Sequence, residues 1–205
     1  PLYSSAASDV YKRQLFGLVN TALHYFFFYL GVSNSPGGRA SILDSLGTFL
    51  LILAAAVVFR EKLTLRSIFG CLLGFSGIVL INLGSTAGQF TLSGDGMLLC
   101  SSVCAMVGGL LTRVVTRKMD PLVATGHSLA LGGALLIPAG LLMGAHPVGV
   151  HLKGLLILAA LVAVSAVGFS FYNQLLRYHP VGQIAIYNAF IPVLGAVSYT
   201  HLRAH

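Results

Sequence analysis

The sequence predicts an all-α integral membrane protein with seven transmembrane helices visible. Of its 205 residues, 56% are hydrophobic and only 8% are charged, against about 25% charged residues in an ordinary soluble protein. So few charged side chains cannot cover a globule of this size with solvated groups, so we expect its solvent to be lipid. No apolar run alternates with the period of two that a membrane β-barrel strand requires, so the barrel class is disfavoured.

Seven long apolar runs follow one another along the chain. Each contains 17 to 23 residues, which at about 1.5 Å per residue matches a hydrocarbon core about 30 Å thick. The predicted helices are, in order, Leu15 to Val32, Ala40 to Phe59, Ser67 to Leu83, Gly96 to Thr112, Leu122 to Met143, Gly154 to Leu176 and Val181 to Ser198.

Both ends of the chain are polar and basic, unlike everything between them. The strings SSAASDVYKRQ and VSYTHLRAH resemble translated adapter sequence from sequencing libraries. We therefore expect residues 1–14 and 199–205 to be non-native, and the remainder to be a fragment cut at both ends.

The basic residues in the short loops predict the orientation of the helices. One set of alternate loops holds seven lysines and arginines and the other holds two, Arg39 and Lys153. Positively charged loops stay on the cytoplasmic side, so the first helix is predicted to run from inside to outside. The seven are Arg60, Lys62, Arg66, Arg113, Arg117, Lys118 and Arg177. Because cytoplasmic loops account for the positive net charge, we expect no nucleic-acid partner.

An internal repeat relates two distant parts of the chain. The segment Pro36 to Ile42 aligns with Pro180 to Ile186 at an offset of 144 residues, and the same offset places Asp44 on Asn188. Five helices separate the two copies, so they have opposite orientations in the membrane. This arrangement indicates an inverted repeat of five helices, which is common in secondary transporters.

The chain resembles the EamA-type members of the drug/metabolite transporter superfamily. The resemblance lies in the aromatic helix and turn from Tyr25 to Gly38, in Phe59-Arg-Glu-Lys-Leu-Thr64, and in the glycine-spaced helix from Gly70 to Gly77. It continues through Gly94-Asp95-Gly96 and Asp120-Pro121. It implies ten helices in two inverted five-helix repeats, of which these are helices three to nine. Residues 15–88 would then close the first repeat and residues 89–198 would open the second.

Two titratable residues within the apolar runs are the candidates for proton coupling. Asp44 lies inside a run, where a carboxylate costs about 2.5 to 3.5 kcal/mol on insertion scales. In a functional interpretation, Asp44 is a proton site or the counter-charge for a cationic solute. In the structural alternative, it lies near the outer end of its helix, where it reaches water or pairs with Arg39. His24, near the midpoint of its helix, either titrates and binds solute or is a core histidine satisfied by a neighbouring helix.

Other polar and aromatic residues complete a predicted substrate site at the interface of the two repeats. Asn20 lies one helical turn before His24, and Asn188 aligns with Asp44. Amphipathic groups at such an interface can stack on a small organic solute or form hydrogen bonds with it. The predicted substrate-binding residues are Asn20, His24, Asp44, Thr48, Tyr172, Asn173 and Asn188.

Two further features have structural interpretations. Gly70, Gly74 and Gly77 share one helical face, which predicts close packing against another helix. Glu61, beside Lys62 at the cytoplasmic end of a helix, is interpreted as part of a solvated ion-pair cluster, with a gate contact as the sharper alternative.

We expect a secondary transporter of a small organic metabolite or drug, in the cytoplasmic membrane of a bacterium or archaeon. No phosphate loop of the GxxxxGK type occurs, so ATP-driven transport by this chain is not indicated. The three cysteines lie in apolar runs and predict no disulfide, metal or cofactor site. The alternatives are a membrane scaffold or receptor without transport, and a rhomboid-like protease using Ser76 of Gly74-Phe-Ser-Gly77 with His127 as base.

Overall fold

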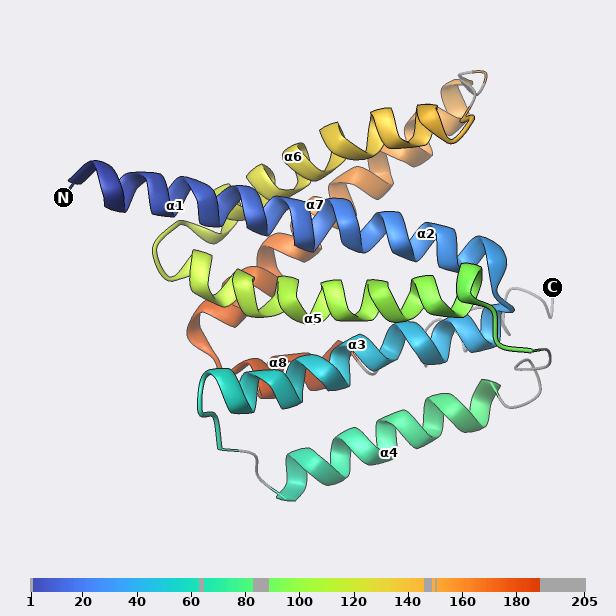
Figure 1. The fold of residues 1–205 in the computed structure, drawn as a ribbon, viewed down its shortest axis with the longest axis horizontal. Helices are drawn as coiled ribbons and strands as arrows, with labels where there is room; N and C mark the ends of the chain where they lie inside the picture. The colour runs from blue at the N-terminus through green and yellow to red at the C-terminus, as the bar shows by residue number, and fades with distance from the viewer. Residues whose placement is uncertain (1, 63–64, 83–88, 146–148, 150, 189–205) are drawn as a thin grey trace. The chain divides into compact units, whose positions relative to one another are not determined.

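The computed structural model is built from helices alone in the part of the chain it describes, which excludes residues 1, 63–64, 83–88, 146–148, 150 and 189–205. This confirms the predicted all-α membrane protein. The elements in order are α1 (Leu2–Gly17), η1 (Leu18–Leu23), α2 (His24–Asn34), α3 (Gly37–Val58), α4 (Leu65–Asn82), η3 (Leu92–Gly96), α5 (Met97–Thr116), α6 (Pro121–Leu142), α7 (Leu152–Tyr178) and α8 (Val181–Asn188) (Figure 1). The segments η1 and η3 are short π-helices.

Five helical stretches among the described residues are long and apolar enough to cross a membrane. They are Asp9–Asn34, Gly37–Val58, Leu92–Thr116, Pro121–Leu142 and Leu152–Tyr178. A sixth predicted span corresponds to α4, whose apolar stretch Ile68–Leu80 is shorter. The seventh begins at Val181 as predicted and is helical to Asn188, and its remaining residues lie outside the described part of the chain.

The first helix is longer than the hydropathy indicates. It begins at Leu2 rather than Leu15 and continues through the π-helical turn to Asn34. Hydropathy marks where a helix enters the hydrocarbon, but a helix can extend beyond it because polar side chains are satisfied in water. Here Lys118 Nζ donates to Asp9 Oδ1 at 3.0 Å, which ties the polar extension to the turn after α5.

The chain divides into two compact units, and the first comprises residues 2–22 and 111–178. In this unit α6 packs against both α1 and α7. A small core forms where Phe16, Val115 and Ala124 meet, with Leu111 and Met119 against them. Along much of α7 the apolar side chains are exposed, as expected of a helix that faces lipid.

The start of α6 shows how local sequence sets a helix boundary in this unit. Asp120 precedes the helix and its carboxylate accepts hydrogen bonds from the backbone N–H groups of Leu122 and Val123, at 2.9 and 3.3 Å. Pro121 occupies the first helical position, where its missing N–H costs nothing. The Asp-Pro pair is therefore a helix start signal.

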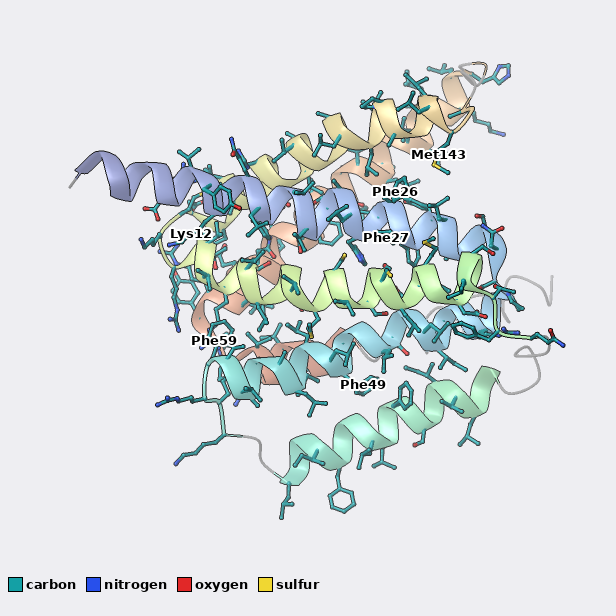
Figure 2. All side chains as sticks on the ribbon, viewed as in Figure 1. Lys12, Phe26, Phe27, Phe49, Phe59 and Met143 are labelled. Carbon is teal, nitrogen blue, oxygen red and sulfur yellow. The ribbon has the colours of Figure 1, made fainter. Side chains whose placement is uncertain are left out.

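The second unit comprises residues 23–110 and 179–188 of the described chain. Its helix α3 contacts α2, α4 and α8, and Leu51, Ile52 and Ala55 of α3 are buried. Between α3 and α4, Phe49 meets Phe75 edge-to-face with ring centroids 4.9 Å apart (Figure 2).

Candidate functional site

The second unit holds a histidine and serine pair that joins two membrane helices. His24 begins α2 directly after the π-helical turn, and its Nδ1 lies 3.1 Å from Ser101 Oγ and 3.2 Å from the Ser101 carbonyl oxygen on α5. Ser101 Oγ also donates to the His24 carbonyl at 3.2 Å. Ser101 is fully buried. The π-helical turn that precedes His24 is of a kind that often occurs at functional sites. When Nδ1 carries the proton, Nε2 is left as an acceptor for a solute or a second proton.

Asp44 lies on α3 in the same unit. Its charge is within electrostatic reach of His24 and of the neighbouring Tyr25. It lies seven positions after Gly37, the first residue of α3, which places it about 10 Å inside that end of the helix. Thr48 follows one turn later on α3 and is half-buried. His24, Asp44 and Thr48 therefore belong to the same unit, and Asp44 is exposed there.

Aromatic rings line α2 next to this histidine. The imidazole of His24 lies 4.9 Å from the ring of Tyr25 and 6.2 Å from that of Phe28, measured between centroids. Tyr25 in turn stacks on Tyr29 at 5.9 Å. This arrangement places aromatic rings next to polar atoms, and such rings can contact a planar or cationic group of a small organic solute.

The first unit contains a separate polar network that crosses three helices. Asn20 Nδ2 donates to Ser128 Oγ at 3.5 Å, and Thr21 Oγ1 shares a hydrogen bond of 2.8 Å with the same oxygen. One turn earlier on α6, Thr125 Oγ1 accepts from Asn173 Nδ2 at 2.7 Å. Thr21, Thr125, Ser128 and Asn173 are all buried. Hydroxyls and amides that meet between membrane helices hold those helices together.

The predicted site residues are thus placed in both units. His24, Asp44 and Thr48 belong to the second unit, while Asn20, Tyr172 and Asn173 belong to the first. Tyr172 is half-buried on α7. Asn188 closes α8, and its side chain lies outside the described part of the structure.

Two of the three glycines on the predicted packing face of α4 make no close contact among the described residues. A Cβ added to Gly70 or Gly77 would meet no atom of another described element within 4 Å. The reason is that a glycine stripe permits close approach without supplying a partner helix. The close approaches occur elsewhere, as at Gly47, 3.2 Å from the backbone of Ser102, and at Gly109, 2.7 Å from Leu51, both measured from the added Cβ.

Two acidic residues have roles that sequence reasoning did not assign. Asp95 is fully buried and forms an ion pair of 2.7 Å with Arg39, the residue considered as a partner for Asp44. Glu61 accepts hydrogen bonds from the backbone N–H groups of Val181 and Gly182, so it is more than part of a solvated ion-pair cluster. The Gly94-Asp95-Gly96 motif is the sequence signal for Asp95, and the position of Glu61 after a predicted helix end does not identify α8 as its partner.

The described residues contain no group of three His, Cys, Asp or Glu side chains that could hold a metal ion. Ser76, the serine of the protease alternative, donates to the Leu73 carbonyl within its own helix at 3.0 Å. This is the usual back-bonding of a serine in a helix.

Comparison with known proteins gives a consistent picture. An uncharacterized transporter of Archaeoglobus fulgidus is 25% identical over 63% of this chain and 46% of its own length. An uncharacterized transporter of Synechocystis is 29% identical over 65% of this chain and 45% of its own. A chloroplastic WAT1-related protein of Arabidopsis thaliana is 29% identical over 60% of this chain and 31% of its own length. The chain therefore spans less than half the length of these relatives.

A solved structure and a family model extend the comparison to most of the chain. One crystal structure of a protein matches 92% of this chain and 66% of its own chain, with a TM-score of 0.69 and 20% sequence identity. This match shows that the two chains share a fold. The model of the EamA-like transporter family matches residues 8–83 and 92–200. The chain belongs to the EamA-like transporter family.

Proposed function

We propose that the complete protein is a secondary transporter that moves a small organic metabolite or drug across the cytoplasmic membrane by alternating access. The observation that carries this proposal is the His24–Ser101 pair with Asp44 in electrostatic reach, set inside apolar helices of an EamA-like transporter. Ionisable groups at membrane depth are costly and usually mark a path for a solute or an ion.

The proposed architecture is a pair of inverted five-helix repeats. The family match falls into two segments, residues 8–83 and 92–200, and this break supports a division between residues 15–88 and 89–198. In transporters of this kind, substrates bind near the midplane where the two repeats meet. The proposed contacts of the solute in this chain are His24, Asp44 and Thr48, because Asn20 and Asn173 already bond to Ser128 and Thr125 within the first unit.

Proton coupling through Asp44 and His24 is the finer part of the proposal. A carboxylate and an imidazole that sense each other's charge bind protons interdependently, so a bound cation or an arriving proton at one changes the proton affinity of the other. The solute and the proton would then compete for the same polar atoms. This competition links movement of one to movement of the other.

The test uses the full-length protein with its flanking helices, reconstituted in sealed proteoliposomes. A panel of amino acids, nucleosides and cationic drugs is offered with and without an imposed pH gradient. Asp44→Asn and His24→Gln should abolish the response to the gradient. The matched controls are Asp120→Asn, which retains a helix cap, and His127→Gln at an exposed position of α6, and both should leave the response unchanged. Transport whose pH dependence persists in the Asp44→Asn, His24→Gln double variant contradicts proton coupling at these residues.

A further inference from the structure

Glu61 fastens the start of α8 to the segment that follows α3. Its Oε1 accepts from the N–H of Val181 at 3.0 Å, and its Oε2 accepts from the N–H of Gly182 at 3.2 Å. The first N–H groups of a helix have no partner within the helix, and a carboxylate there also meets the positive end of the helix dipole. Both carboxylate oxygens are engaged by a helix that lies 120 residues further along the chain.

The backbone before Glu61 is shaped for this contact. Arg60 adopts a φ of 53°, a left-handed conformation that residues other than glycine rarely take. This residue follows α3 by two positions and turns the chain at the helix end. The chain therefore changes direction between the end of α3 and Glu61.

Asp95 makes a corresponding attachment at the other end of α3. Its Oδ1 accepts from Ser35 Oγ at 2.7 Å, and its Oδ2 accepts from Arg39 at 2.7 Å and from the Thr91 N–H at 2.9 Å. Ser35 precedes α3 and Arg39 lies in its first turn, whereas Asp95 lies in η3 at the start of the next repeat.

The two attachments hold the beginnings of two repeat-related helices, α3 and α8, and they lie at opposite ends of α3. Pro36, before α3, aligns with Pro180, before α8, so each acid holds the beginning of an equivalent helix. The 22 residues of α3 separate the attachments by about 33 Å, roughly one hydrocarbon thickness. The basic loop residues place Glu61 on the cytoplasmic side and Asp95 on the outer side.

We propose that these acids form two latches that open in turn during transport: an inner latch, Glu61 with Val181 and Gly182, and an outer latch, Asp95 with Ser35, Arg39 and Thr91. This inference rests on the transport function proposed above, because alternating access requires each face to open while the other stays closed. Release of an acid frees the start of its helix at that face only.

Cysteine labelling from each face of the membrane tests the latches in the full-length protein. Native cysteines are replaced by alanine, and two fully buried residues serve as reporters, Leu98→Cys near the outer latch and Ala185→Cys near the inner one. Glu61→Ala should raise the labelling rate of Ala185→Cys from the cytoplasmic side about tenfold and leave Leu98→Cys unchanged. Asp95→Asn should raise the labelling rate of Leu98→Cys from the outer side and leave that of Ala185→Cys unchanged. Glu61→Gln, which keeps an acceptor oxygen for one N–H, should give a smaller rise.

The outcomes separate the latches from simple packing and from the transport function. An equal rise at both reporters after either substitution, or no rise at either, overturns the proposal. If Glu61→Ala or Asp95→Asn does not accumulate in the membrane, Glu61→Gln and Arg39→Lys are labelled under the same criteria. Labelling needs no solute, so rates that respond face by face in a protein that transports nothing would support the latches and reject the proposed transport.

Discussion

Replacement of Gly132 by alanine should destabilise the packing of α6 against the first helix, while the same change at Gly133 should not. A Cβ at Gly132 would overlap the Cβ of Thr21 and lie 3.1 Å from the backbone nitrogen of Ala22. Neither atom is the far end of a flexible chain, so the helices must separate. At the adjacent Gly133 an added Cβ meets no described atom within 4 Å.

The magnitude follows from these contacts. Overpacking of this kind costs about 1 to 3 kcal/mol, whereas an alanine in an open helix interior gains up to about 1 kcal/mol over glycine. Both substitutions gain the higher helix propensity of alanine, so the difference between them is the cost of overpacking. We therefore expect Gly132→Ala to be less stable than Gly133→Ala by about 1 to 3 kcal/mol. In soluble domains of about 150 to 250 residues, 1 kcal/mol shifts Tm by about 2 to 4 °C, so the difference in Tm should be at least about 2 °C.

The assay is thermal unfolding of the purified full-length variants in detergent, followed by the loss of the monodisperse peak in size-exclusion chromatography. A Thr21→Gly background provides an internal check, because removal of that Cβ should lessen the cost of Gly132→Ala. Equal Tm values for Gly132→Ala and Gly133→Ala would refute the close contact between α6 and η1.

Two smaller predictions concern polar contacts of α6, each measured by the same thermal assay. Thr125→Val should cost about 0.6 to 1.7 kcal/mol because the buried Asn173 amide loses its acceptor. Asn173→Leu should cost less, since Thr125 Oγ1 still donates to the Pro121 carbonyl at 2.7 Å, and the opposite ranking would contradict this network. Asp120→Ala should lower the free energy of unfolding by about 1 kcal/mol because α6 loses its N-terminal cap. Asp120→Ser should lower it less, because serine also caps helices. Equal losses of stability in the two variants would argue against capping by Asp120.

The membrane spans were predictable because entry into hydrocarbon depends on residue type and run length alone. Five predicted spans coincide with long apolar helices, and the sixth with the shorter α4. The extension of the first helix to Leu2 was missed, because it depends on polar contacts such as that of Asp9 with Lys118. Hydropathy carries no information about such contacts.

The chemistry of the site was only partly predictable. His24 stands out in an apolar run, but its partner Ser101 does not, because serine and threonine are common in membrane helices and usually bond to their own backbone. Only packing shows that Ser101 faces His24. Likewise, a glycine stripe is visible in sequence at Gly70 to Gly77, whereas the partner helix that makes glycine necessary, as at Gly132, is visible only in three dimensions.

Solute exchange by the complete protein tests the proposed transport most directly. Proteoliposomes preloaded with each unlabelled solute of the panel are diluted into its labelled form, without ATP and without an imposed gradient. We predict that at least one small organic solute exchanges faster than in protein-free liposomes, and that Asp44→Asn and His24→Gln slow this exchange. Exchange no faster than in protein-free liposomes for every solute would contradict secondary transport and favour a scaffold or receptor.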